Sequence, residues 1–370
     1  MLFLGRVGLV RSVGLFSGIL ILTSACIGSI RPLSVNPDMP RDLPKELKNR
    51  FEIMDSATVA LRGPGSLMVE EVSSSKKSIK RKGTKKDLAK KGGKIQVASS
   101  QTLETFSYPT RRPASDPIWI SERMVFGIYY FGVAAGEFSL DVLPFKTIHD
   151  RKVYHIRGQA RSTPVFSLFY RLNDLVESFF DYDGNFSHRF HIVIDESKQR
   201  RDAIELNDSE KKETFYWNRW ERKDTPFTET KQYGKIEPFS QDSLSALYYL
   251  RTVPLEVGKV FVFPVVSEGK SWEAVCTVLR KEEFSAPTGK VKAWVIRPQM
   301  RENGEIKNKE DSFIWISDDE RRVPLRVEAK VKVGTIVAKL WKFEPGMKPE
   351  PLVAPLGPSA GETGSVVKVN

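Results

Sequence analysis

The sequence predicts a mainly all-β fold: a curved antiparallel sheet, closed or half-closed into a β-barrel, with one short helix that covers or plugs it. Three observations support this prediction. After Pro117 short runs alternate apolar and polar residues, turn-forming residues separate the runs, and helical spacing interrupts them at residues 240–252. Short strands at regular spacing are typical of sandwiches and barrels.

The strands can be placed in order from this alternation. Residues 124–131 are apolar and aromatic, and residues 132–136 are turn-like. Phe138, Leu140 and Val142 then alternate with polar neighbours, which completes a hairpin. Later alternating runs cover residues 186–194, 272–278, 325–333 and 336–340. Because successive strand residues point to opposite faces, we expect each of these strands to bury a single face.

The helical segment has its own start and stop signals. Leu244, Leu247, Tyr248 and Arg251 follow the spacing i, i+3, i+4, i+7. Ser240 or Asp242 can cap the start, and Pro254 ends the run. A helix inside a meander of strands is expected to cover an open face of the sheet or to plug one mouth.

Residues 1–25 have the pattern of an export signal. Arg6 and Arg11 precede an apolar stretch at 13–22, and small residues lead to Cys26. This arrangement resembles the lipobox of bacterial lipoproteins, although Thr23 stands where leucine is usual. We therefore predict lipidation (palmitate) of Cys26, with an ordinary cleavage near Ala25 or an uncleaved anchor as alternatives. The predicted location is the cell envelope, facing the periplasm, with the outer membrane favoured over the inner because Ile27 follows the cysteine.

The charge is concentrated outside the predicted domain. The chain of 370 residues has a formal net charge of +12, and residues 76–94 contain ten Lys or Arg and one acid. Residues 118–343 contain 36 Lys or Arg and 33 Asp or Glu. We therefore predict a basic, largely disordered tether at 26–115, with a short amphipathic helix at 44–61, a β-rich domain at 116–345, and a disordered tail at 346–370 rich in Pro and Gly. No aromatic residues interleave with the basic tract, which argues against nucleic acid as a partner.

Residues that could carry chemistry are sparse. His188 and His191 would point to opposite faces of a strand, so no metal site is predicted. Residues 318–320 are adjacent acids between two strands and fit a solvated turn, and Cys276 shares its face with apolar residues. The letters G-x-S-x-G at 357–361 lack the strand and helix that a nucleophile elbow requires. We predict no catalytic residue and no cofactor.

Apolar and basic side chains define a possible binding site. Aromatic and helical residues are most often core, but in a curved sheet they can line an apolar cavity for a lipid-like ligand. The candidates for the lining are Phe166, Phe169, Tyr170, Phe179, Leu247 and Tyr248. Arg157, Arg161 and Arg171 could contact an anionic group at its edge, although strand arginines usually only increase solubility.

Several segments together resemble a known family. They are residues 131–137 (FGVAAGE), 166–170 (FSLFY), 242–251 (DSLSALYYLR), 286–289 (APTG) and 318–325 (DDERRVPL). In this order they are similar to the landmark segments of the bacterial domain-of-unknown-function 3108 family, over roughly residues 124–343. The resemblance implies an envelope location and a β-rich fold, and it brings no activity or ligand.

Three functions remain open on these observations. The first is a non-enzymatic envelope lipoprotein, held on the membrane by its lipid, whose domain binds a lipid-like or polymeric envelope component in its concavity. The second is a structural or protein-interaction module that docks an envelope protein on a strand edge. The third is an envelope hydrolase. A real cavity would favour the first, and a packed core with an exposed, uncharged edge strand would favour the second.

Overall fold

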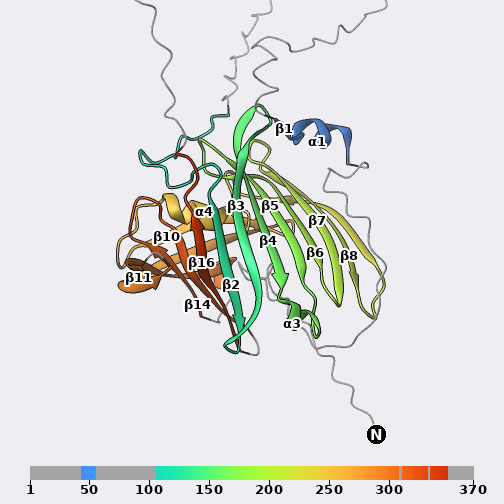
Figure 1. Ribbon diagram of the computed structural model, residues 1–370. Coiled ribbons are helices and arrows are strands. Elements are labelled where there is room, and N and C mark those ends of the chain that lie inside the picture. The colour runs from blue at the N-terminus through green and yellow to red at the C-terminus, as the bar shows by residue number, and fades with distance from the viewer. Residues whose placement is uncertain (1–42, 56–105, 288, 308–310, 332–333, 349–370) are drawn as a thin grey trace, which may run out of the picture.

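A single curved sheet dominates the protein (Figure 1). The computed structural model describes residues 43–55, 106–287, 289–307, 311–331 and 334–348. Within these ranges the sheet has 16 strands, paired antiparallel, and it curves on itself without closing. The predicted all-β class is thereby confirmed, in the half-closed form.

The strands follow the order of the chain around the sheet. They are β2 (Arg123–Tyr130), β3 (Val133–Ile148), β4 (Arg151–Ser162), β5 (Asn173–Asp181), β6 (Ser187–Asp195), β7 (Gln199–Asp208), β8 (Glu213–Arg222), β9 (Thr228–Lys235), β10 (Val260–Ser267), β11 (Lys270–Ala286), β12 (Gly289–Glu302), β14 (Ser312–Ser317), β15 (Pro324–Lys330) and β16 (Thr335–Glu344). The short strands β1 (Met54–Asp55) and β13 (Glu305–Ile306) pair with β3 and β12. Because β16 pairs with β2, the two edges of the sheet are β9 and β10, which are consecutive in the chain.

Several hairpins are built on the same tight turn. Two-residue loops join β2 to β3, β3 to β4, β10 to β11 and β12 to β13. Both loop residues have positive φ in each, as at Phe131 (50°) and Gly132 (78°). This is the type I′ geometry, whose twist matches that of the flanking strands. Asn, Asp and Gly are the usual residues in such turns, so a phenylalanine at the first position is not explained by the turn.

The inner side of the sheet holds the larger apolar cluster. Its members come from nearly every strand and from helix α4 (Ser245–Thr252), whose Leu247, Tyr248 and Leu250 are buried. The Asp242 carboxylate caps the helix by accepting hydrogen bonds from the backbone N–H groups of Leu244 and Ser245. The predicted helix is confirmed over residues 245–252, so it begins later than the predicted 240; Asp242 rather than Ser240 caps it, and it ends before Pro254. Helix α4 packs against the inner core, as expected of a covering helix.

The expectation of a single buried face is wrong for part of the sheet. Strands β5, β6 and β7 are buried on both faces over most of their length. A second apolar cluster lies outside the sheet and joins Phe179, Ile204 and Trp217 to Leu43 and Phe51, next to helix α1 (Lys45–Arg50). The predicted tether range 26–115 therefore contains residues that pack on the sheet. No helix in the described part of the chain is long and apolar enough to cross a membrane.

The gap between the two edge strands narrows at one place. The turn between β10 and β11 reaches across the gap, where the backbone N–H of Gly269 donates to Glu205 on β7 and the amide of Gln232 on β9 donates to the carbonyl oxygen of Glu268. A methyl group at Gly234 would overlap the carbonyl oxygen of Gly269. The close approach of these two backbones therefore requires glycine at position 234.

Substituting Gly234→Ala should lower the free energy of unfolding by about 1–3 kcal/mol, because the backbones of β9 and the β10–β11 turn must separate. Urea denaturation of the full chain would measure the change. Gly127→Ala is the matched strand control, since the atoms nearest to its methyl group belong to the exposed side chain of Trp341, which can rotate away, and not to backbone. Equal losses in the two variants would contradict the proposed close approach.

Candidate functional site

The six side chains predicted to line a cavity do not gather at one place. Tyr170, Leu247 and Tyr248 are buried in the inner cluster, and Phe166 packs against it. Phe179 lies in the outer cluster, on the other side of the sheet. Phe169 is 69% exposed. These six residues therefore do not form the common lining that the predicted apolar ligand cavity requires.

A small pocket lies elsewhere, beside α1. It is lined by Arg50, Phe51, Tyr108, His149, His188, Asn207, Asp208 and Ser209, and the space between these residues does not admit even a water-sized molecule. Sites for small molecules usually enclose about 300–1,000 Å³. This pocket is therefore too small for the lipid-like ligand that the first hypothesis requires.

The three predicted arginines do not form one clamp either. Arg157 donates to Glu177 through both Nε and Nη2, at 3.0 and 2.9 Å. Arg171 makes a two-point contact with Asp195. Arg161 is exposed at the end of β4 and has no ion pair within the described ranges. Two of the three charges are thus neutralised by acids of the same sheet.

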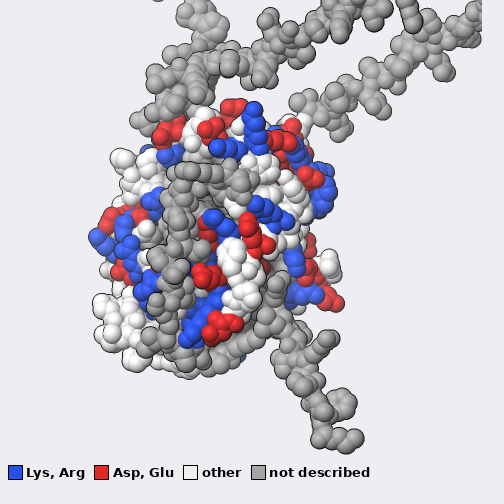
Figure 2. Space-filling view, turned by 90° about the vertical axis from the view of Figure 1, so that its right-hand side faces the viewer, with Lys and Arg blue, Asp and Glu red and all other residues white. Residues whose placement is uncertain are grey.

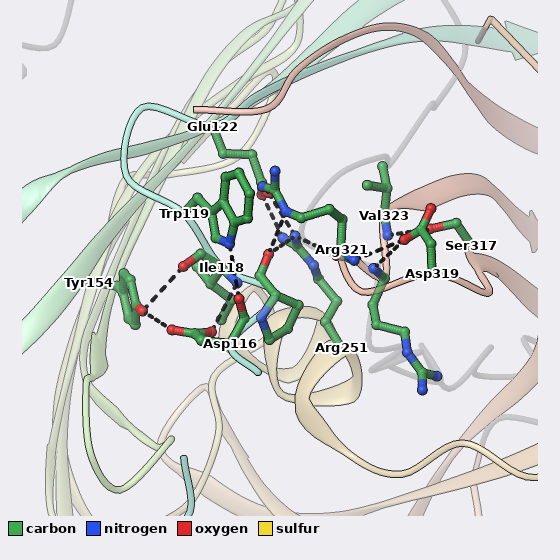
Figure 3. Close-up of polar contacts among 12 residues, drawn as sticks. Asp116, Ile118, Trp119, Glu122, Tyr154, Arg251, Ser317, Asp319, Arg321 and Val323 are labelled. Carbon is green, nitrogen blue, oxygen red and sulfur yellow. Dashed lines mark hydrogen bonds and ion pairs between the residues drawn. The ribbon is translucent and has the colours of Figure 1, made fainter. Parts of the chain in front are cut away.

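A buried charge network lies where the N-terminal segment of the domain meets α4 (Figure 3). We call Glu122, Arg251 and Arg321 the Glu122 cluster. Glu122 and Arg251 are fully buried, and their side chains pair through two contacts of 2.6 and 2.8 Å. Arg321, from the turn between β14 and β15, also donates to Glu122. The Arg251 guanidinium further donates to the carbonyl oxygens of Pro117 and Arg321.

The Glu122 cluster ties three distant segments together, because 129 residues separate Glu122 from Arg251 and 199 separate it from Arg321. Next to it, Tyr154 donates to the Asp116 carboxylate at 2.5 Å, and Figure 3 shows both side chains below Trp119. Burial, and then the charge of Asp116, raise the pKa of Tyr154 far above its usual range. Both carboxylate oxygens of Glu122 accept hydrogen bonds from arginines. This arrangement is therefore suited to holding the three segments together rather than to proton transfer.

The turn at residues 318–320 behaves as the sequence predicts. Asp319 accepts hydrogen bonds from the backbone N–H groups of Arg321 and Arg322 and from the hydroxyl of Ser317. Asp318 pairs with Lys281 at 2.6 Å. These acids stabilise a turn and do not face a pocket. Cys276 is a free, buried thiol, and burial raises its pKa to about 12.

Three histidines each contact a carboxylate on a neighbouring strand. The pairs are His155–Glu177 at 2.9 Å, His188–Asp181 at 2.8 Å and His191–Asp202 at 2.8 Å. His188 and His191 thus bond to different acids. No group of three or more potential metal ligands occurs among the residues that the structure describes.

The His188–Asp181 contact borders the small pocket and bears on the hydrolase hypothesis. Burial opposes ionisation of Asp181, but hydrogen bonds from Arg151 and His188 outweigh it and lower its pKa to about 2. The same carboxylate also accepts from the backbone N–H groups of Asp183 and Gly184. The Ser209 hydroxyl at this pocket accepts from the backbone N–H of Phe239. These partners give the pair a structural role in the β5–β6 turn.

Another pair of acids is buried beneath the β4–β5 loop. Burial, followed by the charge of Glu196, raises the pKa of Asp174 to about 8. Glu196 accepts hydrogen bonds from the Tyr170 hydroxyl and the Gln199 amide. The Asp174 and Glu196 side chains also hydrogen-bond to each other, which requires a proton on one of the two carboxyl groups. The pair therefore holds a proton near neutral pH, and it does so beneath a loop rather than in an open cleft.

Comparison with protein families identifies the domain. The model of a family described as a protein of unknown function (DUF3108) matches residues 125–340. The chain belongs to the DUF3108 family. The expectation from the landmark segments is confirmed, and the matched range contains α4 and both edge strands. No curated protein matches this DUF3108 chain.

Solved structures resemble the DUF3108 domain only distantly. A β-barrel-like protein of the DUF1849 family from Brucella abortus has a TM-score of 0.39 at 10% identity, over 61% of this chain and 98% of that one. A Bacteroides fragilis protein described as exported, with a YmcC-like fold, has a TM-score of 0.28 at 8% identity, over 64% and 98%. A Parabacteroides distasonis protein described as a lipoprotein has a TM-score of 0.27 at 8% identity, over 65% and 100%.

The β10 edge of the DUF3108 domain is apolar and open. Its first residues, at 260–263, read Val-Phe-Val-Phe, and the side chains of Val260 and Val262 are each 50% exposed. Gln241 covers the far end of this edge: its N–H donates to the carbonyl oxygen of Pro264, and its carbonyl oxygen accepts from Val266. In a strand, the backbone N–H and C=O groups of residues two apart point toward the same side. Those of Val260 and Val262 therefore point to the same side as those of Pro264 and Val266, but Gln241 does not bond to them.

The other edge is of the opposite kind. Strand β9 carries Glu229, Lys231 and Lys235, and these charges are the usual protection of an edge strand against pairing with another chain. Strand β10 has no charged residue between Val260 and Ser267. The sequence shows the uncharged run Val260–Val266 but not that it forms an edge, and for this reason sequence analysis did not select it.

Proposed function

We propose that this DUF3108 domain is a non-enzymatic protein-interaction module of the bacterial cell envelope, which docks a strand of an envelope partner on β10. The observation that carries the proposal is the exposed, uncharged β10 edge beside a protected β9 edge. The proposal includes an anchor at Cys26, which lies outside the described residues. The packed inner cluster supports this function over ligand binding in the concavity.

The chemistry of the edge specifies the partner. Backbone N–H and C=O groups would provide the affinity, as in other complexes formed by strand addition. The half-exposed valines at 260 and 262 would select apolar, β-branched or aromatic side chains at alternate positions of the added strand. A long acidic or basic strand would be excluded, because burying its charges against these valines is costly.

Site-specific cross-linking in the native envelope tests the proposal. A photoreactive amino acid at position 260 should form one adduct of defined mass, and Val262→Lys should reduce its yield at least about fivefold, because charge on an edge strand opposes pairing. Val262→Thr keeps a β-branched strand residue and should keep the adduct. Thr230→Lys places the same charge on β9 and is the matched control.

The proposal fails if position 260 forms no adduct, or if Val262→Lys and Thr230→Lys give the same yield as the unmodified chain. Native mass spectrometry of the same preparations tests the alternative function. An extra mass that is lost on solvent extraction, and that all these variants retain, would instead support a bound lipid-like ligand.

A further inference from the structure

A cluster of exposed apolar side chains lies at one end of the sheet, away from the β10 edge. We call Phe131, Val133, Val165, Leu168 and Phe169 the rim. Each is between 64% and 74% exposed. They come from two loops: the tip of the β2–β3 hairpin and the β4–β5 connection, which contains the short helix α3 (Pro164–Ser167).

The two loops of the rim lie side by side. The backbone N–H of Thr163, before α3, donates to the carbonyl oxygen of Ala135 at 3.0 Å, and Gly136 pairs with Ser162. Figure 1 places α3 below β4, at the end of the sheet where β2 and β3 meet in their hairpin. In Figure 2 the lower left edge of the molecule is uncharged, at the end and on the side where Figure 1 shows these loops. Both loops thus present their exposed apolar side chains at the same end of the sheet.

The fold itself does not require these residues. Phe131 occupies a left-handed turn position, with φ of 50°, where Asn, Asp or Gly would be favoured and where its ring remains 67% exposed. Leu168 and Phe169 follow α3 and are more exposed than the buried Tyr170 next to them. Apolar residues at strained or solvent-facing positions do not stabilise the core, and they therefore indicate a contact with something outside the domain.

We infer that the rim inserts into the surface of a lipid bilayer. The residues from Ser162 to Tyr170 include no charged side chain, and neither do those from Ile128 to Gly136. Around α3 the backbone N–H groups of Ser167, Leu168, Phe169 and Tyr170 donate to carbonyl oxygens of the same loop, and the Thr163 hydroxyl accepts from the N–H of Phe166. Backbone groups in contact with hydrocarbon must form their hydrogen bonds within the protein. The N–H groups around α3 do so, and they are therefore not free to pair with a partner strand.

The charges beside the rim fit an anionic lipid surface. Arg161 is exposed one residue before the uncharged stretch, and Arg171 follows it directly. Arg171 is paired with Asp195, whereas Arg161 has no ion pair within the described ranges. Segments that bind at a membrane surface often carry basic residues on either side of an apolar tip. The tip inserts among the lipids, and the basic residues attract anionic head groups.

The depth of a spin label measures the insertion. In the full chain with Cys26→Ser, Phe169→Cys offers a thiol at an exposed position, while Cys276 is buried and escapes labelling. With vesicles of phosphatidylethanolamine and phosphatidylglycerol, a nitroxide at position 169 should collide at least about fivefold less often with a water-soluble nickel chelate. Its collisions with oxygen, which partitions into hydrocarbon, should increase.

A second label separates insertion from simple adsorption. The basic tract at 76–94 can hold the chain on anionic vesicles by itself, so flotation with vesicles is not the readout. Val257→Cys labels an exposed position in the loop after α4, near the end where β2 begins, and that label should remain open to the chelate. Adding Phe131→Asp and Leu168→Asp to the Phe169→Cys chain should restore chelate access at 169. Aspartate suits the turn at 131, so this variant is expected to fold.

The inference is overturned if the label at 169 stays open to the chelate on vesicle-bound protein, if positions 169 and 257 are shielded equally, or if the two aspartates leave the shielding unchanged. A specific protein adduct from a photoreactive group at 169, with no shielding by vesicles, would also overturn it in favour of a protein partner. None of these results affects the test at position 260.

Discussion

Replacing Glu122 with glutamine is expected to lower the free energy of unfolding by about 3–5 kcal/mol, the cost of leaving a buried charge without its partner. Glu122 is the carboxylate that Arg251 and Arg321 share, and Arg251 is fully buried. The amide can still accept hydrogen bonds, but it offers no charge to the two guanidinium groups. The urea midpoint of the full chain would measure the loss.

The reverse deletion should cost less. Arg251→Met leaves Glu122 paired with Arg321, so the carboxylate keeps one cation. In the double variant Glu122→Leu with Arg251→Met the two fully buried charges are removed together, while the slightly exposed Arg321 keeps its charge, and part of the stability lost in Glu122→Gln should return. Arg123→Met is the control, because the Arg123–Asp141 pair is partly exposed and surface pairs contribute about 0–1 kcal/mol. A loss below about 1 kcal/mol in Glu122→Gln would contradict the role of the Glu122 cluster in closing the fold.

Asp174→Asn is expected to stabilise the protein by roughly 3–4 kcal/mol more at pH 8 than at pH 5, because each pH unit between the unfolded and folded pKa values corresponds to about 1.4 kcal/mol. Burial and the nearby Glu196 raise the pKa of Asp174 from 3.8 to about 8. The folded state therefore binds a proton that the unfolded state releases above pH 4. Stability from this group is complete below about pH 4 and is lost as pH rises toward 8. Asparagine is neutral throughout, so the variant should lack this part of the decline.

Chemical denaturation at a series of pH values would test the titration of Asp174. Asp224→Asn, at an exposed position in the turn between β8 and β9, removes an acid without changing a buried group and should leave the pH dependence intact. An equal difference between Asp174→Asn and the unmodified chain at pH 5 and pH 8 would show that Asp174 is not protonated in the folded protein. In that case the buried pair beneath the β4–β5 loop would need another explanation.

Local chemistry explains what the sequence predicted correctly. Alternation places Phe138, Leu140 and Val142 on one face because strand side chains alternate, and all three are buried. The α4 helix follows from its apolar spacing, from the Asp242 cap and from Pro254. The acids at 318–320 form a turn because they lie between two strands. Each of these features depends on neighbours within a few residues.

The ligand-site residues could not be predicted in the same way. Phe179 and Tyr170 are both buried aromatics, but they lie in clusters on different sides of the sheet, and periodicity does not indicate which face another segment will cover. The outer cluster depends on Phe51, which is 128 residues before Phe179 in the sequence. Burial on both faces of β5 to β7 therefore follows from a distant segment and not from the strands themselves.

The sequence by itself determined the family, the antiparallel β class, the position of α4 and the concentration of charge at 76–94. Only the tertiary structure decided which strands are edges, that Glu122 meets two arginines, and that the apolar tips of two loops lie together. The physical reason is that strand pairing, charge pairing and the clustering of loops join residues far apart in the chain. Their geometry is fixed by the closure of the whole sheet, whereas alternation and capping are fixed within a few residues.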